Sequence, residues 1–130
     1  MTTRKLTTAL AALVAAVGTA GAATVAHAAT SAKISISATG ADDANRFSGF
    51  VTSSRDSCHS GRTVYLYKQR GRTRSVGRDT RVGSDRATPN QDGSQYSIAT
   101  GQSGRFYAYV KATRSCNAAF SKVVSSAEDD

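Results

Sequence analysis

Apolar and polar residues alternate in short runs from about residue 33 onwards, without a sustained period of 3.6 residues. A period of two indicates strands that bury one face, and the Gly, Ser, Asn and Asp between the runs indicate turns. We expect strands around Ile34 and Ile36, at 46–53, 62–68 and 75–83, around Tyr96 and Ile98, and at 106–112 and 120–125. Seven short strands in about 100 residues are typical of an immunoglobulin-like or related sandwich. The pattern predicts one all-β domain at 33–126, an antiparallel Greek-key sandwich, with flexible ends at 29–32 and 127–130.

Two of these segments place aliphatic and aromatic side chains on opposite faces. In 62–68, Val64 and Leu66 alternate with tyrosines, and 106–112 repeats this arrangement. These two strands are neighbours in the sandwich topology, so we expect the aliphatic side chains in the core and the tyrosines together on the outer face. Exposed rings can stack on sugar rings, or can simply strengthen the sheet by packing across strands. This predicted tyrosine face consists of Tyr65, Tyr67, Tyr107 and Tyr109, with Lys111 at its border.

The first 28 residues have the pattern of a secretory signal peptide. Arg4 and Lys5 precede an apolar stretch at 6–17, and an Ala-His-Ala motif ends at Ala28. This pattern predicts cleavage before Ala29, with an earlier Ala-Gly-Ala motif as the alternative. A retained membrane anchor is less favoured, because a helix needs roughly 20 apolar residues to span a bilayer. We expect a secreted protein, extracellular or associated with the cell envelope, without a transmembrane segment after processing.

The chain contains two cysteines, Cys58 and Cys116. Cys58 lies between the second and third expected strands, and Cys116 between the sixth and seventh. In an exported protein two cysteines favour a disulfide, and these two connections can lie at the same end of a sandwich. Closing a loop of this length stabilises a chain by about 4 kcal/mol, which is comparable to the whole stability of a small domain. We therefore expect the disulfide to be required for folding.

The chain is strongly basic, with 17 Lys and Arg against 9 Asp and Glu. The cations concentrate between Arg62 and Arg86. Within this segment Arg70, Arg72 and Arg74 alternate around a glycine, where we expect a hairpin between the third and fourth strands. Such charges can protect a sheet edge from pairing with another chain. They can also attract polyanions in a salt-dependent manner.

Several spaced motifs between residues 46 and 124 resemble a known family. They are Phe47-x-Gly49-x-Val51-x-Ser53, Cys58, Arg62-x-Val64-x-Leu66, Val76-Gly77, Asp92-Gly93-Ser94-Gln95-Tyr96, Gly104-Arg105-Phe106-Tyr107-Ala108-x-Val110 and Cys116. The arrangement is similar to small exported bacterial domains related to the carboxypeptidase regulatory-like, transthyretin-like sandwiches. The resemblance implies a seven-stranded Greek-key sandwich that acts as a structural or binding module. It implies no catalytic residues and names no ligand.

One short loop carries residue types that are used in catalysis. His59 is the one histidine beyond the predicted signal peptide, and Asp56, Ser57 and Ser60 lie beside it. A Ser-His-Asp triad needs three groups that converge from different segments. Neighbours in one loop point in diverging directions, so we interpret this segment as a polar loop beside a disulfide. We expect neither enzymatic activity nor a cofactor.

Two groups of residues resemble parts of metal sites. The two cysteines, with Asp56 and His59, could offer four ligands to zinc, but the C-x-x-C or H-x-x-x-H spacing is missing. The segment Asn90-x-Asp92-Gly93 echoes the start of a calcium loop, but Ala99 stands where the closing glutamate is needed. A turn stabilised by Asn and Asp side chains fits the second group better. We expect no bound metal.

These features together predict a non-enzymatic secreted module with a binding or structural role. The expected partner is an anionic polysaccharide or another polymer of the cell envelope, and we expect no role with intracellular nucleic acid. The expected ligand-binding residues are Tyr65, Tyr67, Tyr107, Tyr109 and Lys111 of the tyrosine face, with Arg70, Arg72 and Arg74 of the basic segment.

Two alternative functions use other parts of the domain. A protein-interaction domain of the inhibitor, adhesion or toxin-partner type would use loops at one end, where Arg55 or Arg114 near the cysteines could act as an anchor. A carrier of small molecules, like the chromoprotein sandwiches, is less favoured. Those domains usually have four cysteines and a deep apolar cleft, and this chain has two cysteines.

Overall fold

The computed structural model describes residues 28–41, 44–91 and 93–126. The predicted signal peptide at 1–28 lies outside these residues except for its last position, and the predicted acidic tail at 127–130 lies outside them entirely. Among the described residues, no helix has the length and apolar character needed to cross a membrane.

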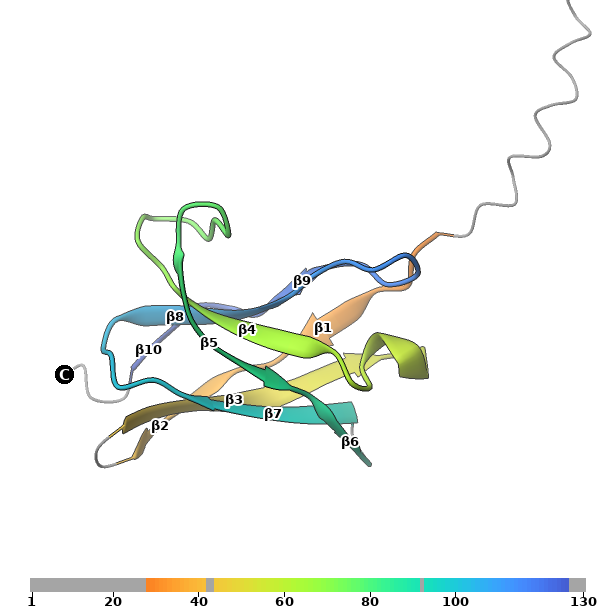
Figure 1. Ribbon diagram of the computed structural model, residues 1–130, viewed down its shortest axis with the longest axis horizontal. Helices are drawn as coiled ribbons and strands as arrows, with labels where there is room; N and C mark the ends of the chain where they lie inside the picture. The colour runs from red at the N-terminus through yellow and green to blue at the C-terminus, as the bar shows by residue number, and fades with distance from the viewer. Residues whose placement is uncertain (1–27, 42–43, 92, 127–130) are drawn as a thin grey trace, which may run out of the picture.

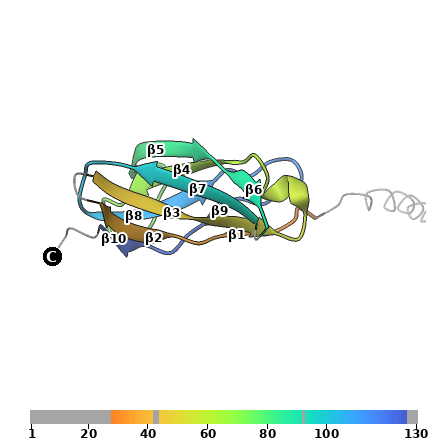
Figure 2. The same ribbon diagram turned by 90° about the horizontal axis from the view of Figure 1, so that it is seen from below.

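In the described residues, ten short strands form two antiparallel sheets that pack face to face (Figure 1, Figure 2). The first sheet contains β1 (Ala32–Ile34), β2 (Ser37–Ala41), β3 (Ala44–Ser53), β6 (Thr88–Asn90) and β7 (Gly93–Ala99). The second contains β4 (Thr63–Lys68), β5 (Thr80–Arg86), β8 (Arg105–Val110), β9 (Ala119–Phe120) and β10 (Val124–Ser125). The predicted all-β sandwich is thereby confirmed.

The strands are ordered as in an immunoglobulin-like Greek key. The first sheet has the order β1-β3-β7-β6, with β2 also on β3, and the second has β10-β8-β4-β5, with β9 also on β8. The paired strands β3 and β7 correspond to B and E of an immunoglobulin domain, and β4 and β8 to C and F. The consecutive strands β5 and β6 pair with β4 and β7 respectively, so this edge segment passes from one sheet to the other.

The core lies between the two sheets. The side chains expected to face inward from the third and sixth predicted strands are all fully buried, namely Val64, Leu66, Phe106, Ala108 and Val110. Phe47 of β3 meets Phe106 of β8 across the two layers, with ring centroids 4.7 Å apart. Gly83 of β5 lies against Ile98 of β7, and a Cβ atom at Gly83 would be 2.6 Å from the Ile98 side chain. The Ile98 side chain therefore occupies the space that a side chain at position 83 would need.

The prediction for the segment after β4 is wrong. The strand expected at 75–83 begins only at Thr80, and residues 69–79 form a long loop, which we call the arginine loop (Figure 1). The carboxylate of Asp79, at the end of this loop, accepts hydrogen bonds from the backbone N–H groups of Arg70 at its start and Ser75 near its middle. These bonds fold the segment back on itself, whereas the apolar side chain of Val76 is only partly buried.

The first and last strands are also each split in two, which the alternation of apolar and polar residues did not predict. The expected first strand is split into β1 and β2, and the expected last strand into β9 and β10. Pro89, expected in a polar turn, lies in β6 opposite Ser94. An edge strand accommodates proline because its outward positions need no N–H partner in the sheet.

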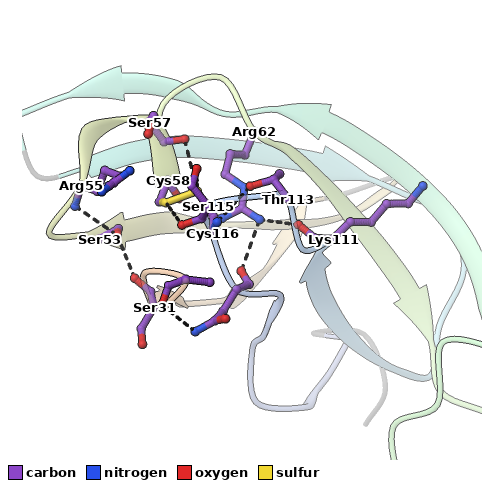
Figure 3. Close-up of a disulfide and its surroundings, with 12 residues drawn as sticks. Ser31, Ser53, Arg55, Ser57, Cys58, Arg62, Lys111, Thr113, Ser115 and Cys116 are labelled. Atoms are coloured by element: carbon purple, nitrogen blue, oxygen red, sulfur yellow. Dashed lines mark hydrogen bonds between the residues drawn. A yellow bond between two sulfur atoms is a disulfide. The ribbon is translucent and has the colours of Figure 1, made fainter. Parts of the chain in front are cut away.

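A disulfide joins Cys58 and Cys116, as predicted (Figure 3). Cys58 ends the short 3-10 helix η2 (Asp56–Cys58) between β3 and β4, and Cys116 lies between β8 and β9. Both cysteines are buried, and their Cα atoms are 5.5 Å apart. A structural disulfide indicates an oxidising environment, which is typical of extracytoplasmic compartments.

The guanidinium of Arg62 makes a second connection at the same end of the sandwich (Figure 3). Its Nη1 donates to the carbonyl oxygen of Cys58 at 3.0 Å, and its Nη2 donates to the carbonyl oxygens of Lys111 and Asn117. Arg62 is 7% exposed, and this burial lowers the pKa of its guanidinium below the ordinary value. The side chain thus ties the connection before β4 to the connection after β8.

Replacing both cysteines, by Cys58→Ala with Cys116→Ala, is expected to lower the free energy of unfolding by about 4 kcal/mol, because the unfolded chain regains the entropy of an open loop. Urea denaturation followed by circular dichroism measures this change. Ser54→Ala, at an exposed position of the same connection, is the control and should leave the midpoint unchanged. A double variant as stable as the parent would contradict the expected role of the disulfide.

Candidate functional site

The tyrosines of β4 and β8 lie together on the outer face of the second sheet. The strands pair so that Tyr65 is opposite Tyr109 and Tyr67 is opposite Tyr107. Phe120 of β9 joins them, because it is opposite Tyr109 on the other side of β8. We call these five residues the aromatic row.

Four rings of the aromatic row contact one another, whereas the Tyr65 ring contacts cations. The centroids of Tyr67 and Tyr107 are 5.6 Å apart in a stacked arrangement, and those of Tyr109 and Phe120 are 4.8 Å apart. Phe120 is 42% exposed. It was not among the expected site residues, because its strand is only two residues long and carries little alternation.

The expectation of an exposed tyrosine face is wrong for two of the four tyrosines. Tyr107 is fully buried and Tyr67 is 7% exposed, whereas Tyr65 and Tyr109 are half-buried. The arginine loop is the cause, because it folds against this end of the outer face instead of forming a tight hairpin. Its Asp79 accepts a hydrogen bond from the Tyr107 hydroxyl at 2.6 Å.

Asp79 holds the arginine loop in this position. Its Oδ1 accepts a hydrogen bond from the backbone N–H of Arg70 at 2.9 Å, and its Oδ2 accepts one from Ser75 at 2.7 Å, in addition to the Tyr107 hydroxyl. A further contact comes from Arg74, which donates to the carbonyl oxygen of Ser121. The loop is therefore fastened to β8 and to the segment after β9.

The hydrogen bonds of Asp79 also set the protonation states of Asp79 and Tyr107. Burial alone would raise the pKa of Asp79, but the bonds from Tyr107, Arg70 and Ser75 and the charge of Arg78 together lower that pKa below its ordinary value. Burial and the bond to Asp79 raise the pKa of Tyr107 well above its ordinary value. At neutral pH the carboxylate is ionised and the phenol is the donor.

Cationic side chains lie over the accessible rings. The guanidinium of Arg81 is 4.8 Å from the Tyr65 ring centroid, and the ammonium of Lys111 is 5.5 Å from the same centroid. The guanidinium of Arg74 is 5.1 Å from the centroid of Phe120. Such cation–π contacts hold each cation near the ring while it stays partly solvated.

Two hollows border the arginine loop. One, of about 450 Å³, lies within the loop and is lined partly by Arg70, Arg72, Arg78 and Asp79. The other, of about 490 Å³, lies between the loop, the start of β8 and the segment that joins β9 to β10. Its charged lining residues are all cations, namely Arg72, Arg74, Arg105 and Lys122. The arginines expected to bind a ligand thus line two adjoining hollows beside the aromatic row.

In the described part of the chain, no carboxylate forms an ion pair with a lysine or an arginine. Among the described residues, the one ion pair joins His59 to Asp56 at 3.2 Å, and no Lys or Arg forms one. The acidic residues in the described part of the chain are Asp56, Asp79 and Asp85. Asp79 bonds as described above, and Asp85 accepts a hydrogen bond from the backbone N–H of Ser97 at 2.8 Å. These carboxylates thus serve backbone and hydroxyl donors and leave the basic side chains free to meet external anions.

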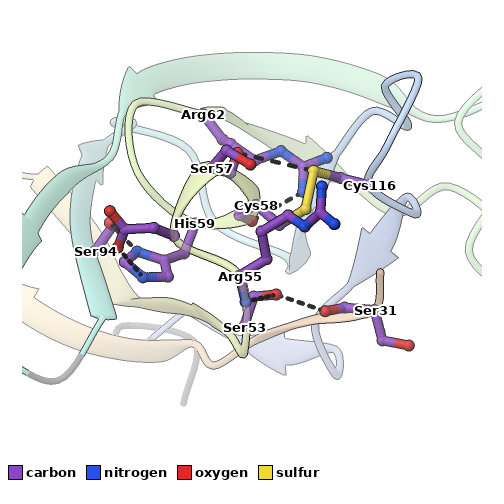
Figure 4. A network of polar contacts seen from close by, with 10 residues as sticks. Ser31, Ser53, Arg55, Ser57, Cys58, His59, Arg62, Ser94 and Cys116 are labelled. Carbon is purple, nitrogen blue, oxygen red and sulfur yellow. Dashed lines mark hydrogen bonds and ion pairs between the residues drawn. A yellow bond between two sulfur atoms is a disulfide. The ribbon is translucent and has the colours of Figure 1, made fainter. Parts of the chain in front are cut away.

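In the structure His59 contacts Ser94, a serine that the sequence did not indicate as its partner. Nδ1 of His59 is 2.8 Å from the hydroxyl of Ser94 on β7, while Nε2 contacts Asp56 (Figure 4). This order of groups resembles a triad, but Ser94 is fully buried and the Asp56 side chain is 91% exposed. A nucleophile needs access to substrate and its orienting carboxylate needs burial. The burial here is the reverse, so this contact serves to dock η2 on β7.

The candidate metal ligands are not assembled in the described residues. Cys58 and Cys116 are consumed by their disulfide, and no cluster of three or more His, Cys, Asp or Glu occurs in the described part of the chain. The candidate calcium turn includes Asp92, which lies outside the described residues.

Comparison with models of protein families, with curated proteins and with solved structures finds no match to this chain. The resemblance to carboxypeptidase regulatory-like domains therefore stays a prediction. The function of the chain is therefore inferred from the sandwich architecture and the geometry of its outer face.

Asp79→Asn is expected to release the arginine loop, because the uncharged amide is a weaker acceptor for three donors. The pKa of Tyr107 should then fall towards the ordinary value of about 10, which a spectrophotometric titration of tyrosine measures. Asp56→Asn removes an equal charge from an exposed site and is the control. An unchanged tyrosine titration in Asp79→Asn would contradict the proposed fastening.

The same bond predicts a dependence on pH in the parent protein. Because the pKa of Asp79 is lower in the folded state than in the unfolded chain, its stabilisation is complete at neutral pH. It is lost as the pH falls below about 4 and through the lowered pKa. Acidification should therefore expose Tyr67 and Tyr107 before the sandwich unfolds, detectable as a change in near-ultraviolet circular dichroism that precedes the far-ultraviolet change. Simultaneous loss of both signals would contradict this order.

Proposed function

We propose that this protein is a secreted, non-enzymatic module that binds an anionic polysaccharide or another polyanionic polymer of the cell envelope. The observation that carries the proposal is the unneutralised positive charge around the arginine loop. A linear polyanion presents repeated negative groups, and it gains affinity from the counterions that it releases when several cations contact it.

The hollow between the arginine loop and the segment that joins β9 to β10 is the centre of the proposed binding surface. Arg72, Arg74, Arg105 and Lys122 line it without an acidic residue. Arg105 also donates to the carbonyl oxygen of Gly71 at 3.1 Å, which braces the loop against β8. Cations that are already positioned lose less side-chain freedom when the polymer arrives.

The exposed part of the aromatic row supplies the second element of the proposal. Phe120 with Arg74, and Tyr65 with Lys111, each place a ring next to a cation. A sugar that carries a carboxylate or sulfate can pack its ring on the aromatic side chain and direct its charge to the neighbouring cation. This combination favours charged polysaccharides over polyanions without rings.

The proposed role agrees with the family that the sequence resembles. Carboxypeptidase regulatory-like domains are expected to be structural or binding modules, and we propose that this chain is a distant member of that group. The basic arginine loop is the feature that distinguishes it and that we associate with its ligand.

A protein-interaction role is the second candidate, and the rigid end of the sandwich favours it. Arg55 and Arg114 are both exposed and lie close in sequence to the disulfide-linked cysteines, and Figure 4 places Arg55 beside the disulfide. A rigid loop with a basic anchor suits a trypsin-like protease. Inhibition of such a protease that is lost in Arg55→Ala or Arg114→Ala would favour this role over polymer binding.

The charge contribution is tested by the double variant Arg72→Gln with Lys122→Gln. It should elute from heparin resin at lower salt than the parent, with a dependence of log affinity on log salt that is shallower by roughly one for each removed cation. Lys33→Gln with Arg114→Gln has the same net charge and changes residues outside the hollow, so it should retain the parent slope. Equal losses in both double variants would contradict a localised surface.

The aromatic contribution is tested by Tyr65→Leu with Phe120→Leu. Loss of stacking should weaken binding to an anionic oligosaccharide by about 30-fold, because each of the two ring contacts contributes roughly 1 kcal/mol. Binding to polyphosphate, which has no sugar rings, should be unchanged and is the control ligand. Equal weakening for both ligands would contradict a role in sugar stacking.

A further inference from the structure

A third pocket lies at the disulfide end of the outer face, away from the arginine loop. It has a volume of about 410 Å³ and is bounded by η2 with the segment after it, the start of β4 and the segment that follows β8. The polar side chains that line it belong to Ser57, Ser60, Arg62, Thr63, Lys111 and Thr113. We call it the hydroxyl pocket.

The lining of the hydroxyl pocket is rich in donors and contains no carboxylate. Within the described residues, the hydroxyls of Ser57, Ser60 and Thr63 have no hydrogen-bond partner in the protein. The Thr113 hydroxyl accepts a bond from the N–H of Cys116 at 3.0 Å, which leaves its own proton available to donate. Four hydroxyl donors from three segments therefore surround one pocket.

Arg62 brings an uncompensated charge to the wall of this pocket. It is buried, and its guanidinium bonds to three backbone carbonyl oxygens but to no carboxylate of the described residues. Carbonyl dipoles satisfy its N–H groups without cancelling its charge. A buried charge that lacks a counter-ion is costly. An anion bound nearby would lower this cost.

We propose that the hydroxyl pocket binds a single phosphate or sulfate group. The hydroxyls of Ser60, Thr63 and Thr113 donate to its oxygens, and the ammonium of Lys111 and the guanidinium of Arg62 supply the opposing charge. A tetrahedral oxyanion accepts bonds from several directions at once, which suits donors on three different segments. This discrete site goes beyond the polyanion surface of the proposed function, with which it shares only Tyr65 and Lys111 at its border.

The disulfide and Arg62 give this pocket a fixed shape. The segment with Ser57 and Ser60 is linked to the segment with Thr113 through Cys58 and Cys116 (Figure 3). Donors held in place by a covalent link need little reorganisation when an anion enters. Selectivity for one oxyanion group over a diffuse polyanion is expected from this rigidity.

The test is a titration of the parent protein with inorganic phosphate, and separately with sulfate, at constant ionic strength maintained with chloride. Backbone amide resonances of Ser60, Thr63 and Thr113 should shift and saturate for at least one of the two anions, and the two titrations identify which is preferred. Thr63→Val and Ser60→Ala, which keep the net charge, should each weaken binding about tenfold. Thr88→Val, on β6 of the other sheet, is the matched control and should bind as the parent does.

Lys111→Met and Lys33→Met test the charge, because both remove one cation and only Lys111 lines the pocket. The first should weaken binding and the second should not. The proposal is overturned if neither anion causes saturable shifts at these residues, or if the shifts fall on the arginine loop instead. Equal weakening in Thr63→Val and Thr88→Val would overturn it as well. Heparin retention depends on Arg72 and Lys122 and is unaffected by Thr63→Val, so failure of the pocket and failure of the polyanion surface are distinguishable.

Discussion

The outer face of the second sheet depends on one constraint, the link between the connection before β4 and the connection after β8. The Cys58–Cys116 bond makes this link covalent, and the Arg62 guanidinium adds hydrogen bonds to carbonyl groups of both connections. Strands β4 and β8 begin or end at this link, and they carry the tyrosines in register. Both candidate binding regions are therefore built on strands whose relative position is held at one end.

The alternation of residues was sufficient to predict the sandwich, the core and the neighbouring tyrosines. Val64 and Leu66 are buried because every second side chain of a strand must face the same layer. The arginine loop was not predictable in the same way, since its course depends on Asp79 reaching Tyr107, 28 positions later in the chain. The partner of a side chain at such a distance has no local signature. The same reason explains why Phe120 and Ser94 were missed.

The hydrogen-bond partners of the carboxylates explain why the surface around the arginine loop stays positively charged. Asp79 and Asp85 are hydrogen-bonded to N–H and O–H groups, and neither forms an ion pair with a Lys or Arg of the described residues. The arginines are instead braced by carbonyl oxygens and aromatic rings. This arrangement fixes the positions of the cations and keeps their charge available. We infer that the domain has two anion-binding regions, one extended and one confined.

The lack of a side chain at Gly83 limits which substitutions this fold tolerates. β5 is paired with β4 on both sides of this residue, and the Ile98 side chain of the facing β7 fills the space that a Cβ atom would need. A methyl group here would act as a wedge between the layers, and overpacking of this kind costs about 1–3 kcal/mol. Natural variation of the domain should therefore be wide in the arginine loop and nearly absent at position 83.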